Sequence, residues 1–265
     1  MRIEYRQRTQ PQSMPQMHAH GLHELYYLLS GTRRYFVEDT IYDVSPGELV
    51  LIPQNQLHRT VTTGHFERYV VYFTQEECES ITRLVGELAV RQLLHSGCLQ
   101  LPEEITRQVR QDLQALEQEL GGNRSFREGI CTHLLNDIFL RALRHGRKKA
   151  SSQGENAEKI QEVARYITRN YAQMITLESA AELACMEKTY FSKRFKALTG
   201  FGFQEYLTQT RIRAAQELLR SSRLSVGEVA EVCGFAGGNY FGDVFRRTVG
   251  VSPSQYRKTP DAADL

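Results

Sequence analysis

Residues 176–206 read TLESAAELACMEKTYFSKRFKALTGFGFQEY, and residues 225–256 read SVGEVAEVCGFAGGNYFGDVFRRTVGVSPSQY. The second stretch repeats the first, at an offset of 49 residues before the turn and 50 residues after it. The matching positions are Ala181 with Ala230, Tyr190 and Phe191 with Tyr240 and Phe241, Phe195 with Phe245, Gly200 with Gly250, and Tyr206 with Tyr256. One supersecondary unit is therefore used twice. Each copy joins a short helix to a second helix through a tight turn, which predicts two helix-turn-helix units.

The sequence around the repeats supports this interpretation. Thr176 and Ser225 are expected to cap the first helix of each unit. A long helix over about residues 204–220 is expected to join the units, and another over about residues 157–171 to precede them. The aromatic side chains of the repeat are expected to form the core rather than to stack on bases. They are Tyr190, Phe191, Phe195, Tyr240, Phe241 and Phe245.

Charge is distributed unevenly along the chain. Residues 157–258 carry 15 Lys and Arg against 10 Asp and Glu, a net charge of +5, whereas residues 1–156 carry 18 against 19, a net charge of −1. A basic C-terminal half indicates an anionic partner for that half. The second helix of each unit also carries cations toward its end, which suits a helix that enters a DNA major groove and holds phosphates. These cations are Lys188, Lys193, Arg194, Lys196, Arg246 and Arg247.

The repeated pattern resembles the AraC/XylS family of transcriptional regulators over about residues 157–258. The first unit carries L-x-x-x-A-x-x-x-x-M-x-x-x-Y-F-S-x-x-F-K, and the second carries A-x-x-x-G-F-x-x-x-x-Y-F-x-x-x-F-R-x-x-x-G-x-S-P-x-x-Y-R. The resemblance implies a DNA-binding domain of seven helices whose two recognition helices enter successive major grooves. It also implies double-stranded DNA, a small-molecule effector and RNA polymerase as partners, a homodimer, and a role as activator or as repressor, between which the sequence does not decide.

Matched by position, the resemblance assigns DNA contacts to individual residues. In the first unit the implied base contacts are Lys188, Thr189, Ser192 and Lys193. In the second unit they are Gly238, Asn239 and Asp243. Further DNA contacts are expected toward the helix ends, from Lys196, Arg246 and Arg247.

The second unit departs from the family pattern in two places. Gly237 and Gly238 stand where the family usually places Asp and a polar residue, so a helix cap is lost. Gly242 and Asp243 stand where the family often shows Ser-Arg. A carboxylate can accept a hydrogen bond from a cytosine amine, but it repels phosphates. We therefore expect the first recognition helix to carry more of the sequence reading.

The N-terminal half is expected to be a small barrel covered by helices. From about residue 22 to residue 73, short runs rich in β-branched and aromatic residues alternate with turn formers. Apolar residues at helical spacing then predict one helix from after Pro102 to Gly121 and another over about residues 125–144. These helices have two compatible roles, which are to cover the open side of the barrel and to form a dimer seam. The stripe that would form the seam is Ile105, Val109, Leu113, Leu116 and Leu120.

Histidines and a glutamate near the start of the chain resemble the two sequence motifs of the cupin barrel. The residues that carry this resemblance are His18, His20, Glu24 and Gly31, followed by Gly47, Pro53 and His58. Side chains two residues apart on a strand point to the same face, so His18, His20 and Glu24 are expected to converge. Together with His58 they would offer three nitrogens and a carboxylate to a divalent transition metal.

An organic effector is the alternative occupant of this site. The cupin motif is incomplete, because Asn55 replaces a glycine and the closing asparagine after His58 is absent. The same groups would then act as hydrogen-bonding partners around an effector, with no ion required. The expected wall of such a pocket is His18, His20, Glu24, Tyr26, Arg33, Tyr35, His58 and Tyr72.

The expected architecture is α+β and multidomain. Residues 1–100 form a cupin-like effector-sensing β-barrel, residues 101–145 a helical dimerisation element, residues 146–156 an exposed linker, and residues 157–265 an all-α domain with two helix-turn-helix units. No apolar run reaches the roughly 18 residues that span a bilayer, the N-terminus lacks an apolar signal core, and the five cysteines are scattered. These features predict a cytoplasmic protein with no membrane partner.

The sequence as a whole predicts a ligand-responsive transcriptional regulator rather than an enzyme. A carbohydrate is the expected effector, on the family resemblance alone. The rival hypothesis is a metal-dependent cupin enzyme, or a metal sensor, fused to a DNA-binding domain. The spacing of the four predicted ligands favours the rival, whereas the incomplete cupin motif and the helical C-terminal half favour the regulator.

Overall fold

The computed structural model describes residues 1–8 and 21–258. The predicted ligands His18 and His20 lie outside these residues. In the described part of the chain, every helix is too short or too polar to cross a bilayer. The chain divides into two compact units: an N-terminal unit, Met1–Val37 with Ile41–Ser152, and a C-terminal unit, Glu38–Thr40 with Gln153–Leu265.

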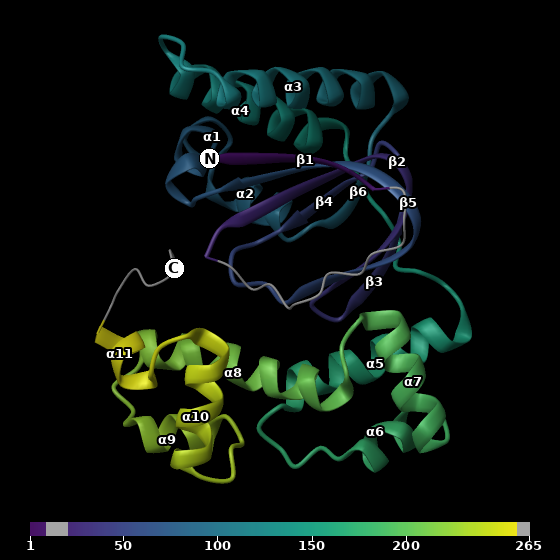
Figure 1. Ribbon diagram of the computed structural model, residues 1–265, viewed down its shortest axis with the longest axis vertical. Coiled ribbons are helices and arrows are strands. Elements are labelled where there is room, and N and C mark those ends of the chain that lie inside the picture. The colour runs from purple at the N-terminus through teal and green to yellow at the C-terminus, as the bar shows by residue number, and fades with distance from the viewer. Residues whose placement is uncertain (9–20, 259–265) are drawn as a thin grey trace. The chain divides into compact units, whose positions relative to one another are not determined.

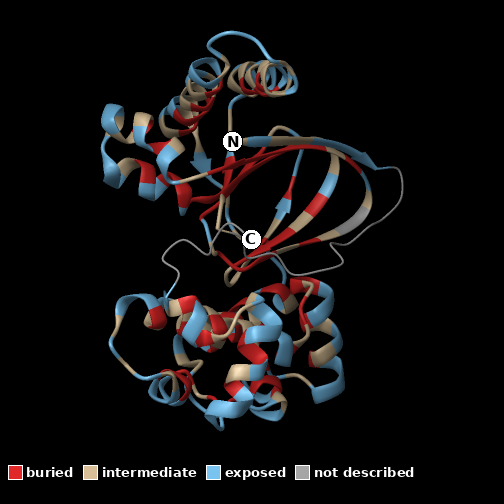
Figure 2. Ribbon diagram, turned by 60° about the vertical axis from the view of Figure 1, so that its left-hand side comes forward, coloured by how far each residue is buried: buried red, intermediate tan, exposed pale blue. Residues whose placement is uncertain are grey.

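The N-terminal unit is built on a curled seven-stranded sheet (Figures 1 and 2). Its strands are β1 (Arg2–Arg8), β2 (His23–Val37), β3 (Thr40–Val44), β4 (Leu49–Ile52), β5 (His58–Phe73), β6 (Gly97–Gln100) and β7 (Arg147–Lys148). They lie in the order β1-β5-β2-β4-β6-β7, and β3 pairs with β2. Among the described residues the edge strands β1 and β7 do not pair, so the cupin-like sheet is open there.

Two register shifts in β2 decide which side chains face the inside of the curl. One shift precedes Gly31 and the other follows it. Gly31 has a φ of 86°, and a Cβ atom there would lie 2.1 Å from the carbonyl oxygen of His65, so only glycine fits. Because of the shifts, Tyr26 and Tyr35 lie on the same face of the sheet although they are nine residues apart, and their ring centroids are 4.8 Å apart.

The two faces of the sheet have different partners. The outer face packs against helices, as Figure 1 shows for α3 and α4. These helical elements are η1 (Glu76–Cys78), α1 (Glu79–Val85), α2 (Glu87–Leu94), α3 (Glu103–Gly121) and α4 (Arg127–His145). The inner face, on the opposite side, has a core cluster whose buried members all come from strands. They are Tyr26, Leu28, Tyr35, Val37, Val44, Val50, Ile52, Phe66, Val70, Tyr72 and Cys98.

The apolar stripe predicted as a dimer seam packs inside its own unit. Helix α3 begins after Pro102 and ends at Gly121, as the sequence predicts. Within it, Val109, Leu113 and Leu116 are fully buried in the core cluster of the outer face. The prediction of a dimer seam is therefore wrong for these three residues, because a side chain buried against its own sheet cannot contact a partner. They perform the other predicted role, which is to cover the sheet.

The segment predicted as an exposed linker over residues 146–156 is partly built into the N-terminal unit. Strand β7 pairs with β6. Beyond it, the Lys149 amide donates to the Cys98 carbonyl at 2.9 Å, and the Ser152 amide donates to the Ile41 carbonyl at 2.7 Å. The prediction is therefore corrected up to residue 152. Backbone hydrogen bonds to sheet edges leave no periodic pattern in the side chains, which is why the sequence did not reveal them.

The C-terminal unit contains the expected seven helices within residues 155–258. They are α5 (Glu155–Asn170), α6 (Leu177–Leu183), α7 (Lys188–Thr199), α8 (Phe203–Ser221), α9 (Val226–Val232), α10 (Gly238–Val249) and α11 (Pro253–Lys258). Helices α6 and α7 form the first helix-turn-helix unit, and α9 and α10 form the second. Thr176 and Ser225 cap α6 and α9 as predicted, each in a capping box.

The aromatic repeat is only partly a core repeat. Phe191 and Phe195 in α7 are fully buried, and so are the matching phenylalanines of α10. Tyr190 and Tyr240 are 46% and 57% exposed, so the prediction that they belong to the core is wrong. Neighbouring residues on a helix point about 100° apart, so a Tyr-Phe pair directs one ring inward and the other outward.

Candidate nucleic-acid interface and ligand site

The second helix of each helix-turn-helix unit presents the predicted DNA contacts to solvent. Helices α7 and α10 bury their phenylalanines on one side and leave the other side open. Of the predicted contacts, Ser192 is half-buried. The exposed ones are Lys188, Thr189, Lys193, Lys196, Gly238, Asn239, Asp243, Arg246 and Arg247. The C-terminal unit therefore carries two solvent-facing helix surfaces with the polar groups that the sequence assigned to DNA.

The turns before these two helices have the same geometry. Cys185 and Gly234, 49 residues apart, have φ values of 51° and 78°. In each turn, the backbone amide of the next residue donates a hydrogen bond to the carbonyl of the repeated alanine in the first helix. The Met186 amide donates to the Ala181 carbonyl, and the Phe235 amide donates to the Ala230 carbonyl, both at 2.9 Å. A Cβ atom at Gly234 would lie 2.5 Å from the carbonyl oxygen of Ala172, so the second turn requires glycine.

The two recognition helices begin differently. The Glu187 carboxylate accepts a hydrogen bond from the Tyr190 amide at 2.9 Å and caps α7. Backbone hydrogen bonds at this helix start lower the pKa of Glu187. Helix α10 starts after Gly237, which has no side chain to cap it, so the cap loss that the sequence predicts is confirmed.

Lys188 at the start of α7 already has a partner in the free protein. Its ammonium lies 2.8 Å from a carboxylate oxygen of Glu178, and both side chains are exposed. This hydrogen bond raises the pKa of Lys188 and lowers that of Glu178. Exposed ion pairs contribute little to stability because water screens them. Lys188 can therefore exchange Glu178 for a phosphate or a base edge at little cost.

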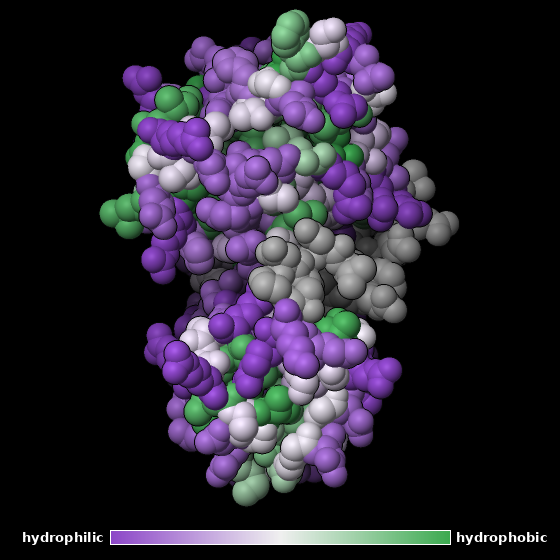
Figure 3. All heavy atoms as spheres, turned by 90° about the vertical axis from the view of Figure 1, so that its left-hand side faces the viewer, coloured by the Kyte–Doolittle hydropathy of each residue, from purple (hydrophilic) through white to green (hydrophobic). Residues whose placement is uncertain are grey.

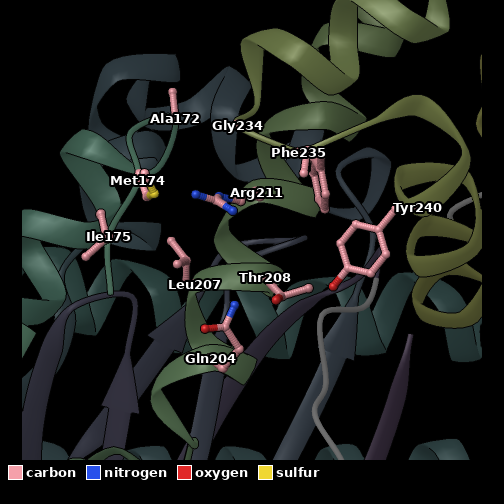
Figure 4. Close-up of a pocket in the computed structure, with 11 residues that line it drawn as sticks. Ala172, Met174, Ile175, Gln204, Leu207, Thr208, Arg211, Gly234, Phe235 and Tyr240 are labelled. Carbon is pink, nitrogen blue, oxygen red and sulfur yellow. The ribbon is translucent and has the colours of Figure 1, made fainter. Parts of the chain in front are cut away.

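A pocket of about 430 Å³ lies between the two helix-turn-helix units (Figure 4). It includes Arg211 of α8, whose guanidinium donates to the carbonyls of Tyr171 and Gln173, both at 2.8 Å. Arg211 thus ties the loop after α5 to α8, and its Nε and Nη2 donors are already occupied by these backbone carbonyls.

Figure 3 shows apolar surface enclosed by hydrophilic side chains on one face of this unit, in the lower part of the picture. The exposed apolar side chains of the pocket wall include Met174 and Tyr240.

A buried group of polar side chains lies on the inner face of the sheet in the N-terminal unit. We call it the inner polar cluster, and its members are Glu24, Arg33, Tyr35, His58, Thr60 and Arg68. Each is at most 6% exposed. Polar side chains buried to this extent in a small unit are costly unless they are hydrogen-bonded or serve a ligand.

Glu24 and His58 form the acidic end of the cluster. The His58 Nε2 atom lies 3.4 Å from Glu24 Oε2, and the Tyr35 hydroxyl donates to Glu24 Oε1 at 3.1 Å. On its other side, His58 Nδ1 lies 2.8 Å from the carbonyl oxygen of Gln56. Burial alone would lower the pKa of His58, but the Glu24 carboxylate and the Gln56 carbonyl outweigh it and raise the pKa.

Arg33 and Arg68 form the basic end of the cluster. The Arg33 Nη2 atom donates to the Thr60 hydroxyl at 2.7 Å. The central guanidinium carbons of Arg33 and Arg68 lie 5.8 and 5.9 Å from the centroid of the Tyr26 ring. Burial raises the pKa of Tyr26 to about 12, so its phenol is a neutral hydrogen-bonding group between two cations.

The structure brings together some of the predicted ligand-site residues. Of the four predicted metal ligands, Glu24 and His58 meet, and the two histidines before residue 21 lie outside the described residues. Within residues 1–8 and 21–258, no group of three or more His, Cys, Asp and Glu side chains could hold a metal ion. The predicted wall residues Tyr26, Arg33 and Tyr35 all belong to or border the inner polar cluster.

Sequence reasoning missed two members of the cluster, Thr60 and Arg68. Both lie on β5, whose predicted wall residue Tyr72 stands opposite Glu24. The period of two along a strand places Arg68 on the same face as Tyr72, four residues away, so this signal was present in the sequence. Thr60 lies two residues after the predicted wall residue His58, so the same period places it on this face, but threonine is common on any strand and does not by itself indicate a site.

The pairing of His58 with Glu24 predicts a dependence of stability on pH. A raised His58 pKa means that the folded chain binds a proton more tightly than the unfolded chain, whose histidines titrate near about 6.5. The stabilisation is complete below that value and is lost as pH rises through the folded pKa. Urea unfolding from about pH 6 to pH 8 should therefore give a falling free energy of unfolding. The Glu24→Gln variant should lack this slope, and an equal slope in both proteins would contradict the pairing.

Comparisons with known proteins cover both units. A family model described as "AraC-like ligand binding domain" matches residues 3–135, and one described as "Helix-turn-helix domain" matches residues 180–259. The HTH-type transcriptional activator RhaR of Pectobacterium atrosepticum is 28% identical over 255 residues, which cover 94% of this chain and 88% of the relative. The HTH-type transcriptional activator RhaS of Escherichia fergusonii is 27% identical over 264 residues, which cover 96% and 91%.

Proposed function

The chain belongs to the AraC family of transcriptional regulators, and on this premise we propose that it binds double-stranded DNA and regulates transcription in response to a small-molecule effector. The observation that carries the proposal is the pair of solvent-facing surfaces on α7 and α10, which follow identical turns in a basic unit. The enzyme alternative is not favoured, because the matching family and the relatives are regulators.

The proposed DNA contacts are the exposed residues of α7 and α10. Lys188, Thr189, Ser192 and Lys193 would reach base edges from α7, and Lys196 would hold a phosphate. Gly238, Asn239 and Asp243 would lie over bases from α10, with Arg246 and Arg247 near phosphates. The side-chain cap on α7 and the lysines around it favour the first helix as the main reader of sequence, as the sequence predicts.

Substitutions in the two helices should have unequal effects on operator binding. We expect Lys193→Ala and Ser192→Ala each to weaken binding by roughly 1–3 kcal/mol. Asp243→Ala should cost less, or improve affinity, because it removes a charge that repels phosphates. Electrophoretic mobility shifts at fixed salt would measure these changes. If Asp243→Ala were the most damaging of the three, the second helix would be the main reader.

The inner polar cluster is the proposed effector site. Glu24, Tyr26, Arg33, Tyr35, His58 and Tyr72 would contribute to it, with a carbohydrate as the expected effector. Both curated relatives named above are transcriptional activators, which supports activation through contact with RNA polymerase. We further propose a cytoplasmic homodimer in which the effector changes how DNA half-sites are occupied.

A footprint on the promoter, with and without a panel of small molecules, tests this function most directly. Protection that spans two half-sites and changes with one class of compound is the expected result. Protection that random-sequence DNA displaces as readily as operator DNA would show non-specific binding only and would contradict a regulator.

A further inference from the structure

Two buried arginines on the inner face have no anionic partner within hydrogen-bond distance among the described residues. Arg33 and Arg68 are 5% and 6% exposed, and an arginine side chain stays protonated in proteins. Among the described residues, Arg33 forms no ion pair, and it donates a hydrogen bond to the neutral Thr60 hydroxyl. Arg68 has only Glu4 near it, at 3.7 Å, which is beyond hydrogen-bond distance.

The remaining donors of these arginines are unsatisfied. Arg33 Nε, Arg68 Nη1 and the Tyr26 hydroxyl are buried, and none has a hydrogen-bond partner among the described residues. The guanidinium carbons of both arginines lie within 6 Å of the centroid of the Tyr26 ring, so the three unsatisfied groups lie close together around Tyr26. Buried polar groups in native proteins are rarely left unpaired, so these donors require a partner such as a bound water, ion or ligand.

The acidic group of the cluster has a partner within the cluster at each of its oxygens. Both oxygens of Glu24 have partners, Oε1 in the Tyr35 hydroxyl and Oε2 in His58. Residues 9–20, which precede β2, contain no Asp or Glu. The inner polar cluster therefore holds two buried guanidinium groups against one carboxylate, and the partly exposed Glu4 of β1 lies 3.7 Å from Arg68.

We propose that the inner polar cluster binds a small organic anion whose acidic group is held by Arg33 and Arg68. This inference rests on the proposed role of the inner face as the effector site, and it specifies the charge of the effector. A guanidinium offers a planar pair of donors that matches a carboxylate or a phosphate in bidentate geometry. The Tyr26 hydroxyl adds a third donor. The centroid of the Phe66 ring lies 4.0 Å from the Arg33 guanidinium carbon, so this ring packs against the Arg33 guanidinium group and limits its movement.

The rest of the site suits a polyhydroxylated ligand. Tyr26, Tyr35 and Phe66 offer aromatic surface, and Glu24 keeps acceptor capacity because a carboxylate has about four lone-pair sites. A sugar acid or a sugar phosphate combines hydroxyl groups with one acidic group. The proposal therefore predicts that an acidic sugar binds better than its neutral counterpart.

Thermal unfolding of the full chain with simple anions is the first test. Acetate and phosphate are titrated at constant ionic strength, with chloride as the reference, into the wild type, Arg33→Met and the matched control Arg34→Met. Arg34 lies next to Arg33 on β2 but is only half-buried and is paired with Asp43. We expect acetate or phosphate to raise the unfolding midpoint of the wild type and Arg34→Met, but not that of Arg33→Met. The more effective of the two anions distinguishes a carboxylate from a phosphate ligand.

The same titrations contain the results that would overturn the proposal. Equal midpoint shifts in the wild type and Arg33→Met, or no shift in either, would do so. Without added anion, Arg33→Met and Arg68→Met should have unchanged midpoints or midpoints raised by up to about 4 °C, since each removes a buried charge that has no hydrogen-bonded anionic partner. Lower midpoints in both variants would show that the arginines only support the fold.

Calorimetry with D-glucuronate, D-glucose 6-phosphate and D-glucose extends the test to ligand class. At least one acidic sugar should bind more tightly than D-glucose, and Arg33→Met should weaken that binding by about 30-fold or more. Binding of D-glucose alone would overturn the proposal. These measurements involve no DNA, so they can fail while the operator footprint succeeds, and the footprint can fail while an anion binds.

Discussion

Replacing Lys149 with methionine is expected to lower the free energy of unfolding of the N-terminal unit by about 3 kcal/mol. The Lys149 ammonium lies 2.8 Å from both carboxylate oxygens of Glu48, and Glu48 is only 6% exposed. Breaking a buried ion pair leaves an uncompensated charge, which costs about 3–5 kcal/mol. The lower end applies here, because Gln100 and the Ser45 amide still donate to Glu48 at 3.0 and 2.8 Å.

Urea unfolding measures this effect, and two further variants isolate its cause. Lys148→Met removes an exposed cation from the preceding residue and should change stability by less than about 0.5 kcal/mol. Adding Glu48→Gln to Lys149→Met removes the buried charge and should restore most of the loss. If Lys149→Met behaved like Lys148→Met, the ion pair would not hold the segment after β7 to the sheet.

The second large effect is expected at a repeated aromatic pair in α10. Phe241→Ala should lower the free energy of unfolding of the C-terminal unit by about 3–5 kcal/mol, because it opens a cavity in a packed core. Phe241 is fully buried, with ring centroids 4.9 Å from Phe235 and 5.5 Å from Phe245. Tyr240→Ala removes a ring that is 57% exposed and should cost far less.

Chemical denaturation and operator binding separate the two variants. Phe241→Ala should lose DNA affinity in proportion to the fraction of unfolded C-terminal unit, since α10 cannot form its surface without its core. Tyr240→Ala should remain folded. Equal destabilisation by the two variants would mean that both aromatic rings of the pair belong to the core, as the sequence pattern alone suggests.

Much of the C-terminal unit could be predicted from the sequence because its signals are local. The capping residues Thr176 and Ser225, the turn at Gly234 and the spacing of the phenylalanines act within a few residues of one helix or turn. The N-terminal unit was predicted less completely. The apolar spacing within helix α3 predicts that helix correctly. It does not decide whether the stripe at Leu113 and Leu116 packs against the sheet or against a second chain, because that depends on which other segment of the fold covers the stripe.

The sequence by itself determined two helix-turn-helix units and the start and end of α3, since helix periodicity and caps need no distant partner. Only the tertiary structure decided which polar residues meet on the inner face. The register shifts around Gly31 bring Arg33 to the side of Tyr26, and the pairing of β2 with β5 brings Arg68 there from a second strand. A shift of one residue moves every later side chain to the opposite face of a strand. The composition of the inner polar cluster therefore depends on strand register, which the backbone of another segment sets.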